Sequence, residues 1–372
     1  MRITLVIERF VPQGGVEAAA WQLAHGLAAA GDDVRVVARE ADPAARVPVQ
    51  RVRVSDAWQP ARVAWFSRAA ARAAPRGAGA IVHSFSRTRH QDVYSADGGS
   101  HAEYMERQYS APGARLRRAS PRHAVLLAIE RRVFADPTQT LLCPSRLVAD
   151  TLASRHGVPR ERLVVIPYGV DLERFAPRPP EARAALRAEL GAGPGPVWLL
   201  VGTGWRRKGL EVALRALARA RARDATLWVA GGDAVAPWRA RARALGVGER
   251  VRFLGRRNDV ERLYAAADAL LLPTRYDAFG AVCLEAAASG LPVVTSGAAG
   301  AAELLGEGAL VVPDAGDAAG FAAALDALAD PAARAARGAA ALAAARAHSL
   351  SARVAAVRAL YARLADARRE RP

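Results

Sequence analysis

Two loops of this sequence place charged side chains where an apolar run gives way to an amphipathic one. The first reads GTGWRRKG over residues 202–209 and follows an apolar run typical of a buried strand. Its glycines let the backbone approach a ligand, and a helix start offers free N–H groups and the positive end of a dipole. Arg207 and Lys208 add two cations that oppose this dipole, so we interpret the loop as a diphosphate site. The Gly-x-x-x-x-Gly-Lys-Ser/Thr pattern of a Walker loop is absent.

Lys208 is the only lysine in the chain, beside 52 arginines, and Asn258 is the only asparagine. Arginine replaces lysine readily where only charge matters, but not where a compact ammonium must fit. The single lysine therefore indicates a functional requirement, with chance as the alternative.

The second loop reads PTRYDAFGAVCLEA over residues 273–286, with Asp277 in the loop and Glu285 one turn into the following helix. Paired carboxylates often act as general acid and base. Carboxylates also accept hydrogen bonds from sugar hydroxyls, and we favour this use, with Glu285 on a ribose and Asp277 on a transferred sugar. Taken singly, Asp277 could equally be a helix cap or turn acid, and Glu285 a half-buried acid paired with an arginine.

Short apolar runs alternate with amphipathic segments along the chain, a pattern typical of parallel sheets covered by helices on both faces. In the first half we expect strands at 3–7, 33–39, 49–54, 80–86, 139–144 and 163–167, and helices that include 16–30, 61–74 and 122–134. In the second half we expect strands at 197–201, 226–230, 251–254, 270–273, 293–296 and 309–312, and helices at 209–223, 238–245, 260–267 and 281–289. A proline- and glycine-rich linker at 176–196 with a short helix at 181–190 separates the halves, and the tail from residue 317 is helical.

The expected fold class is α/β, with two doubly wound Rossmann-like domains that face each other across a cleft. The domains are expected at residues 1–176 and 177–349, and a helix at 350–369 can cross back to the first. Ligands of such sheets bind outside the carboxyl ends of the strands. The loops after residues 7, 82, 201 and 272 are thus the candidate walls of a site.

The chain is strongly basic, with a formal net charge of +17, and residues 51–134 hold 15 arginines against 6 acids. Such charge can attract nucleic acid, an anionic membrane surface or an anionic substrate, and it can also be compositional drift in a chain rich in Ala and Arg.

No run of about 18 uncharged apolar residues is present, and the first eight residues read as a strand, not a signal peptide. Cys143 and Cys283 lie in apolar runs, and we expect two buried free thiols, which suits the cytoplasm.

Taken together, the motifs resemble the retaining GT-B glycosyltransferases of family 4, and most of all the lipopolysaccharide core glucosyltransferases. The resemblance covers nearly the whole chain. It rests on Gly14-Gly15 after the first strand, YSAD at 94–97, IPYGVDLERF at 166–175, RKG at 207–209, GRRNDV at 255–260, and the acid-x7-Glu element from Asp277 to Glu285 with SGLPVV at 289–294. This set is specific for the family and much less specific for the sugar or the acceptor.

The resemblance implies a role for each matching position. The nucleotide sugar would be held by Gly14, Gly15, Arg174, Gly202, Arg207, Lys208, Arg257, Asn258, Asp277, Phe279, Gly280, Ala281, Val282 and Glu285. Arg207 and Lys208 would stabilise the leaving diphosphate, Glu285 would hold the ribose, and Asp277 with nearby backbone amides would hold the donor sugar. Backbone at 257–258 would meet the base.

Catalysis would fall to Asp97, Arg207, Lys208 and Asp277, with Asp97 at the acceptor side near the reacting centre. Gly15 would give a backbone N–H near the distal phosphate. Many family members have Glu at the position of Asp277, which leaves the hydroxyl pattern of the donor sugar open, and several use a His near the position of Asp97. His83 and His101 are close in sequence, and whether either takes part is open.

The implied reaction is transfer of a hexose, with retention, from a nucleotide diphosphate sugar such as UDP-glucose to a lipopolysaccharide core or related glycan. A capsule, exopolysaccharide or small glycoconjugate acceptor is the alternative. No residue stands out as a nucleophile, which favours attack on the face that the diphosphate leaves. No Asp-x-Asp pair is convincingly placed, so we expect no metal and no cofactor beyond the donor. We expect a cytoplasmic protein, peripheral on the inner membrane face through its basic segment.

Two other function classes fit less well. A nicotinamide dehydrogenase would need Gly-x-Gly-x-x-Gly, and the third glycine is missing after Gly202-Thr203-Gly204. A nucleic-acid-binding protein would explain the charge, but no recognisable module is present and aromatic residues are few. We therefore expect a nucleotide sugar and a glycan as partners, and no nucleic acid.

Overall fold

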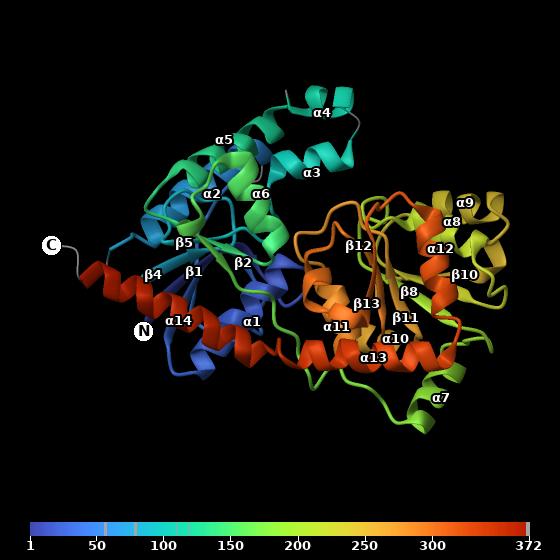
Figure 1. The fold of residues 1–372 in the computed structure, drawn as a ribbon. Helices are drawn as coiled ribbons and strands as arrows, with labels where there is room; N and C mark the ends of the chain where they lie inside the picture. Colours follow the sequence, from blue (N-terminus) through green and yellow to red (C-terminus); the bar gives the residue numbers. More distant parts are fainter. Residues whose placement is uncertain (56–57, 78–79, 110, 119, 370–372) are drawn as a thin grey trace. The chain divides into compact units, whose positions relative to one another are not determined.

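The computed structural model describes every residue except 56–57, 78–79, 110, 119 and 370–372. The chain divides into two compact units, residues 1–169 with 350–372 and residues 170–349 (Figure 1). The division lies ahead of the 176/177 boundary expected from the proline-rich segment, because residues 170–175 pack on the second unit. There the Phe175 ring is buried and meets Tyr264 edge to face, with 5.8 Å between centroids.

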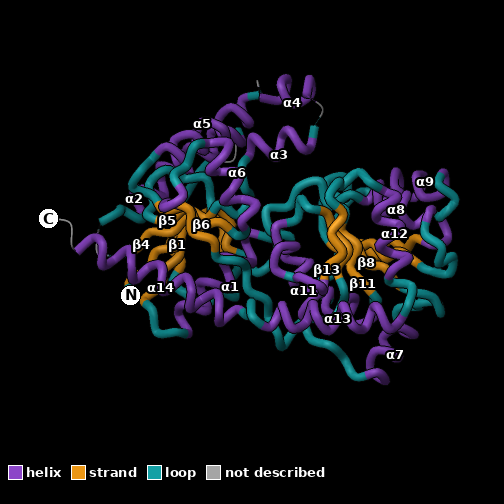
Figure 2. Tube along the Cα trace, viewed as in Figure 1, coloured by secondary structure: helices purple, strands orange, loops and turns teal. Residues whose placement is uncertain are grey.

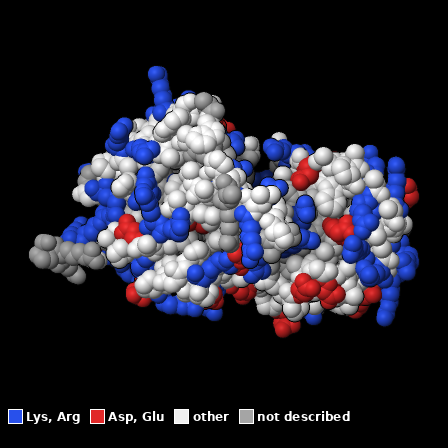
Figure 3. Space-filling view, turned by 90° about the horizontal axis from the view of Figure 1, so that it is seen from above, with Lys and Arg blue, Asp and Glu red and all other residues white. Residues whose placement is uncertain are grey.

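Helices and strands alternate through both units, with strands inside and helices outside (Figure 2). On the face drawn in Figure 3, Lys and Arg side chains are spread over both units and Asp and Glu are fewer. The positive charge on this face is therefore not confined to one segment. Within the described part of the chain, no helix is both long and apolar enough to cross a bilayer.

The first unit is built on a seven-stranded sheet in which all recorded strand pairs are parallel, in the order β3-β2-β1-β4-β5-β6-β7. Its strands are β1 (Arg2–Phe10), β2 (Asp33–Ala41), β3 (Val49–Arg51), β4 (Ile81–Ser84), β5 (Val93–Ser95), β6 (Thr140–Cys143) and β7 (Leu163–Val165). Its helices are α1 (Val16–Ala29), α2 (Gln59–Ala73), α3 (His101–Gln108), α4 (Ala111–Arg118), α5 (Pro121–Ala135), α6 (Arg146–His156) and α14 (Leu350–Arg369), with a 3-10 turn at Arg160–Arg162.

Alternation along β1 explains why helices cover both faces of this sheet. Ile3, Leu5 and Ile7 pack in one cluster with side chains of α1 and α14, whereas Val6 packs in another with Phe66 of α2. The expected strand at 49–54 is shorter, and β5 was not expected at all, because three residues are too few to show a period.

The second unit holds a six-stranded sheet, again with only parallel pairs recorded, in the order β10-β9-β8-β11-β12-β13. Its strands are β8 (Val197–Val201), β9 (Thr226–Ala230), β10 (Val251–Gly255), β11 (Ala269–Leu272), β12 (Val293–Ser296) and β13 (Ala309–Val312). Its helices are α7 (Pro180–Glu189), α8 (Leu210–Arg219), α9 (Val235–Ala244), α10 (Val260–Ala266), α11 (Ala281–Ala288), α12 (Ala318–Ala327) and α13 (Pro331–Arg346). Short 3-10 helices lie at Gly248–Arg250, Gly300–Leu304 and Gly306–Gly308.

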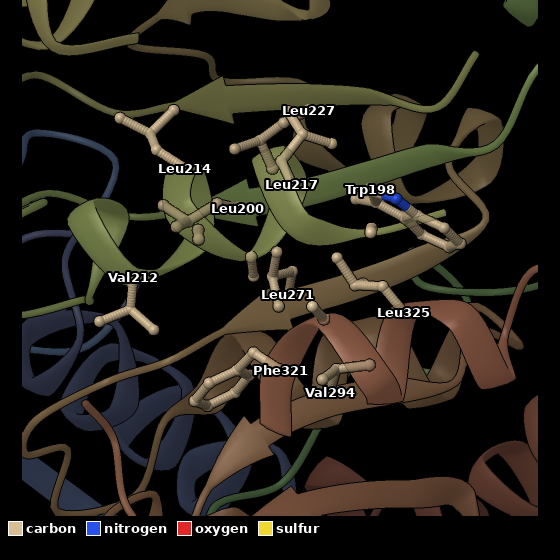
Figure 4. Close-up of a cluster of buried hydrophobic side chains, with 14 of the residues drawn as sticks. Trp198, Leu200, Val212, Leu214, Leu217, Leu227, Leu271, Val294, Phe321 and Leu325 are labelled. Atoms are coloured by element: carbon tan, nitrogen blue, oxygen red, sulfur yellow. The ribbon is translucent and has the colours of Figure 1, made fainter. Parts of the chain in front are cut away.

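The core of the second unit joins this sheet to α8 and α12. Strand residues Leu200 and Leu271 meet Leu214 and Leu217 of α8 and Phe321 of α12 in one buried cluster (Figure 4). The apolar run of β8 is buried along its whole length, so its end is held firmly where the first charged loop begins.

Candidate active site

The two charged loops of the second unit lie against each other at the carboxyl ends of β8 and β11. Gly209 has φ +81° and caps α8, and a Cβ there would come within 1.8 Å of the Pro273 carbonyl oxygen. Only glycine therefore permits this close approach. The Arg207 carbonyl accepts hydrogen bonds from the Arg275 backbone N–H at 2.8 Å and from the Thr274 hydroxyl at 3.2 Å.

Arg207 and Lys208 both contact the carboxylate of Asp277. Lys208 Nζ lies 2.7 Å and Arg207 Nη1 lies 3.3 Å from Asp277 Oδ2, and Nη1 also donates to the Tyr276 carbonyl at 2.9 Å. Burial by itself raises the pKa of Asp277, but Lys208 and then Arg207 outweigh it and hold that pKa below its usual value. The predicted catalytic residues of the second unit thus form one charged cluster.

Gly202 makes room for the lysine of this cluster. Its φ is +121°, and a Cβ at this position would lie 3.0 Å from Lys208 Cε. The ammonium itself is largely buried, since only 9% of the side chain is exposed. The space around the Lys208 ammonium is confined, which agrees with the expectation that a compact lysine is required here and not an arginine.

The backbone amides of the first loop differ from the expectation that they are free. The N–H groups of Gly204 and Trp205 donate to Asp233 Oδ2 at 2.8 Å and Oδ1 at 3.1 Å. Those of Arg207 and Lys208 donate to the Gly204 carbonyl, and α8 begins only at Leu210. These four amides are thus engaged within the protein, and Asp233, which was not predicted from the sequence, fixes the backbone that carries Arg207 and Lys208.

Glu285 projects from α11 and accepts a hydrogen bond from the buried hydroxyl of Tyr264 on α10, at 2.8 Å. Burial raises the pKa of Glu285, against the lowering effects of Tyr264 and Arg174. Glu285 thus has the Tyr264 hydroxyl as its hydrogen-bond partner, where the sequence alternative was an ion pair with an arginine. Tyr264 gave no signal in the sequence beyond an aromatic residue in an apolar helix.

The loop from Asp277 to Gly280 is fixed by a neighbouring turn. The Asp277 N–H donates to Ala298 at 2.9 Å, and the carbonyls of Asp277 and Phe279 accept from Gly300 at 3.1 Å and Ala301 at 2.6 Å. Phe279 is buried, Gly280 caps α11 with φ +84°, and Ala281 and Val282 form the half-buried first turn of that helix. The expected donor-sugar loop is therefore rigidly held.

Arg174, Arg257 and Asn258 lie around the end of β10. Arg174 Nη2 donates to the Asn258 carbonyl at 3.1 Å and pairs with Glu261 at 2.8 Å. Arg257 pairs with Asp259 at 2.6 Å. These contacts fix the segment that is expected to meet the base.

In the first unit, the carboxyl ends of β1, β4 and β5 surround a cavity of about 280 Å³. Its lining combines the carboxylates Glu8 and Glu17 with Arg62, Arg87 and the ring of Phe85. Arg62 pairs with Glu8 at 2.9 Å and Arg87 with Glu130 at 3.4 Å. Aromatic rings with carboxylates suit the apolar faces and hydroxyls of a sugar.

Gly14 and Gly15 follow β1 and are exposed. A Cβ on Gly14, whose φ is +104°, would lie 2.6 Å from Glu17 Oε2, whereas nothing lies within 4 Å of one on Gly15. Their part in phosphate binding stays a prediction.

Asp97 is buried and lies in the sequence between Ser95 and Gly98, two residues that line this cavity. Only 8% of it is exposed, and among the described residues no hydrogen-bond partner reaches Oδ2. Burial raises the pKa of Asp97 to about 6, although Arg353, Tyr168 and Ser95 lower it. A proposed contact between Asp97 and the acceptor stays a prediction.

The two histidines left open from the sequence have partners within the first unit. His83 is buried between Tyr361 and Ser95, at 2.6 and 2.9 Å. His101 Nε2 lies 2.8 Å from His123 Nδ1. Burial, with nearby arginines, lowers the pKa of both His83 and His101 to about 3.

Cys143 and Cys283 are free and buried, as predicted, and burial raises the pKa of each to about 12. In the part of the chain that the structure describes, no three His, Cys, Asp or Glu residues group as metal ligands.

Two family models match the chain. The model described as Glycosyltransferase Family 4 matches residues 13–174, and that described as Glycosyl transferases group 1 matches residues 195–330. Lipopolysaccharide glucosyltransferase WaaG of Escherichia coli (strain K12) is 28% identical over 316 residues, which cover 82% of this chain and 83% of WaaG. A Burkholderia thailandensis protein named "Probable transglycosylase" is 32% identical over 321 residues, 84% of this chain and 82% of that protein.

A third relative, the D-inositol 3-phosphate glycosyltransferase of Mycobacterium sp. (strain KMS), is 37% identical over 184 residues, 47% of this chain and 41% of its own length. Among solved structures, the crystal structure of WaaG, described as a glycosyltransferase involved in lipopolysaccharide biosynthesis, matches with a TM-score of 0.82 at 26% identity. That match covers 95% of this chain and 98% of that one. The expected GT-B fold class with two Rossmann-like sheets is confirmed.

Proposed function

The chain belongs to family 4 of the glycosyltransferases, and we propose that it is a retaining hexosyltransferase. Its donor is a nucleotide diphosphate sugar, UDP-glucose or a similar one, and its acceptor is a lipopolysaccharide core or a related glycan. The observation that carries this proposal is the convergence of Arg207 and Lys208 on Asp277, beside the start of α11. Two cations next to a carboxylate suit a diphosphate next to a sugar hydroxyl.

The charges of this cluster suggest what happens when the donor binds. Asp277 offsets one of the two positive charges of Arg207 and Lys208 in the free site, and the diphosphate, with more negative charge, takes its place on them. Asp277 then accepts a hydrogen bond from a hydroxyl of the donor sugar. Because Asp277 has a shorter side chain than Glu, it favours a hydroxyl that lies closer to the loop.

Bond breaking at the anomeric carbon sends negative charge onto the leaving diphosphate, where Arg207 and Lys208 stabilise it. The acceptor oxygen bonds to the anomeric carbon on the same face, and its proton passes to the departing phosphate oxygen. Positioning and electrostatic stabilisation are the protein's contribution. Asp97 acts at the acceptor side, near the reacting centre, from a buried position close to the cavity-lining Ser95 in the sequence. We propose that turnover needs no divalent ion, because the two cations perform its role.

The nucleotide is held at the other end of the second-unit site. Glu285 accepts hydrogen bonds from the ribose hydroxyls, and Tyr264 fixes the orientation of its carboxylate. The backbone at 257–258, held by Arg174, contacts the base. The raised pKa of the half-buried Glu285 is compatible with this role, since ribose hydroxyls can replace the water that its carboxylate loses.

The likeness to WaaG over most of both chains supports a lipopolysaccharide core acceptor. The D-inositol 3-phosphate glycosyltransferases support the alternative of a small glycoconjugate, and they match less than half of this chain. The cavity behind Glu17 and Phe85 suits one sugar residue in either case. Transfer assays with lipopolysaccharide core oligosaccharides and with inositol phosphates, each against the same donor, separate the two.

We also propose peripheral attachment to an anionic membrane through residues 51–134. In that segment Trp58, Trp65 and Leu116 are 56%, 42% and 78% exposed, which leaves apolar side chains beside the arginines. Sedimentation with vesicles of phosphatidylglycerol and phosphatidylethanolamine at low salt tests this. Absence of binding would remove the proposal without affecting the transfer reaction.

A panel of UDP-, GDP- and ADP-sugars in thermal-shift measurements identifies the donor. The proton NMR spectrum of the product made with that donor then gives the anomeric configuration. An inverted product would refute the same-face course, and full loss of turnover in a chelator would refute metal independence.

A further inference from the structure

A chain of buried hydrogen bonds connects α14 to the wall of the acceptor cavity. Tyr361 Oη of α14 lies 2.6 Å from His83 Nδ1 at the sheet, and His83 Nε2 lies 2.9 Å from Ser95 Oγ. Ser95 lines the cavity, and its hydroxyl also bonds to the Asp97 carboxyl. His83, Ser95 and Tyr361 are all buried, so water does not compete for these bonds.

The direction of these bonds follows from proton counting. The hydroxyl of Ser95 has one hydrogen, and Asp97 as a carboxylate can only accept it. Ser95 must then accept from His83, so His83 carries its hydrogen on Nε2. Because burial keeps the imidazole neutral, Nδ1 has no hydrogen and must accept from the Tyr361 hydroxyl.

We propose that His83 is a positioning residue that directs the Ser95 proton toward Asp97, and that Tyr361 of α14 determines which imidazole nitrogen carries the hydrogen. This role differs from that of a catalytic histidine, which would contact the substrate. Among the described residues that line the cavity, His83 is not included. Its effect on transfer rests on the proposed function, in which Asp97 acts as an ionised carboxylate beside the acceptor.

Several groups face this chain from the elements packed around it. Arg353 of α14 interacts with Asp97, His83 and Tyr361, and its guanidinium lies over the ring of Tyr168 at 4.6 Å. The other groups are Tyr168 and Cys143 beside Asp97, Tyr94 in β5, and Asp32 near Tyr361. Burial raises the pKa of Cys143 and Tyr94 to about 12 and that of Tyr361 as well, so Asp97 is the group that titrates near neutrality.

The tautomer is measured directly on the whole protein, without substrate. With ¹⁵N-labelled histidine, the two ring-nitrogen shifts of a neutral imidazole distinguish the nitrogen that carries hydrogen from the one that does not. The chain has seven histidines, and the His83 signal is the one that vanishes in His83→Gln. We expect hydrogen on Nε2 between pH 7 and 8, where Asp97 is ionised. Hydrogen on Nδ1, or a charged ring in that range, would overturn the proposal.

Variants test the consequence for Asp97 through the acid limb of the kcat/KM profile. Tyr361→Phe keeps the shape of the ring and removes the donor, and we expect the limb to move toward higher pH, with about tenfold lower kcat/KM at pH 6. His83→Leu should do the same, whereas His83→Gln, whose amide N–H can still reach Ser95, should restore most of the loss. Arg358→Gln, which breaks another α14 contact, the 2.7 Å ion pair with Asp32, is the matched control and should leave the limb in place.

A limb that moves equally in Arg358→Gln would show a merely structural effect of α14 and contradict the proposal. If the wild-type protein transfers no sugar, the proposed function fails instead, and the tautomer measurement still decides the assignment of His83. Thermal unfolding of each variant shows whether it folds, and Ser95→Ala, which removes the hydroxyl that joins His83 to Asp97, should move the limb in the same direction as Tyr361→Phe.

Discussion

At the scale of single residues, the most telling feature is that one buried lysine and one arginine share a carboxylate. Asp277 lies 70 residues from Arg207 and 69 from Lys208 in the sequence, and it meets these neighbouring cations because two glycine-dependent loops touch. A buried charged side chain is tolerated when it is paired with an opposite charge. A ligand that pairs better with the two cations can displace the Asp277 carboxylate from them. This is how the free site can be stable and still bind a diphosphate.

Substitution of either cation tests the electrostatic part of the mechanism. For Lys208→Ala and Arg207→Ala we expect kcat/KM to fall by about 10²–10³-fold, as for loss of one oxyanion donor. Arg206→Ala is the matched control, because Arg206 is the exposed neighbour in the same loop. Steady-state kinetics on the three variants make the comparison, and equal losses in all three would argue against specific contacts with the diphosphate.

The raised pKa of Asp97 has a consequence for stability. Because the folded protein holds this proton up to about pH 6 and an unfolded chain only to about pH 4, the wild-type free energy of unfolding falls as pH rises through that window. Asn does not titrate, so the free energy of unfolding of Asp97→Asn should rise relative to that of the wild type as pH rises from 4 to 7. We expect this relative increase to be up to about 3 kcal/mol. Urea unfolding at both pH values measures the difference, and a constant difference would show that Asp97 titrates normally.

At the scale of elements, turns and strand ends determine the site more than the helices do. Gly209 permits contact between the loops, and Asp233 at the end of β9 holds the amides of Gly204 and Trp205. The charged loops could be located from the sequence because glycines and charges interrupt strong apolar runs. Asp233, Tyr264 and β5 could not, since their roles depend on contacts between segments distant in the chain.

Two glycines with similar φ angles allow the effect of a steric clash to be distinguished from the effect of backbone strain. Gly209 and Gly246 have φ of +81° and +72°, but only the Cβ of a residue at 209 would meet backbone, at 1.8 Å from Pro273, whereas nothing lies within 4 Å at 246. We expect Gly246→Ala to lower the free energy of unfolding by about 1 kcal/mol and Gly209→Ala by about 3 kcal/mol or more, with loss of donor binding. Denaturant unfolding and donor titration of both variants check this, and similar losses would mean that the loops separate easily.

At the scale of the whole molecule, two parallel sheets each present a site at their carboxyl edges. The alternation of apolar and amphipathic segments made this fold class predictable from the sequence, and family 4 membership agrees with it. The identity of the acceptor was less accessible, because the cavity of the first unit is lined from six separate segments. The helix α14 contributes to that unit from the far end of the sequence, through Val357, Leu360 and Tyr361 in its core.

Membrane attachment through residues 51–134 is a prediction about the whole molecule, because it concerns a surface and not the transfer site. We expect binding to anionic vesicles that weakens as salt rises, with Trp58→Ala combined with Trp65→Ala lowering it about tenfold or more. Vesicle sedimentation at several salt concentrations is the measurement, and transfer to a water-soluble acceptor fragment is the control that should not change. If the wild type and the double variant bind vesicles equally, the two tryptophans do not contribute and attachment depends on charge alone.

The central claim is that Arg207 and Lys208 bind the diphosphate of a nucleotide sugar, and donor binding tests it most directly. UDP-, GDP- and ADP-sugars are titrated into the wild-type protein and into Lys208→Ala and Arg206→Ala, with the midpoint of thermal unfolding as the readout. We expect one class of nucleotide to raise the midpoint in the wild type and in Arg206→Ala, and to lose that effect in Lys208→Ala. No shift with any nucleotide sugar, or an undiminished shift in Lys208→Ala, would contradict the account.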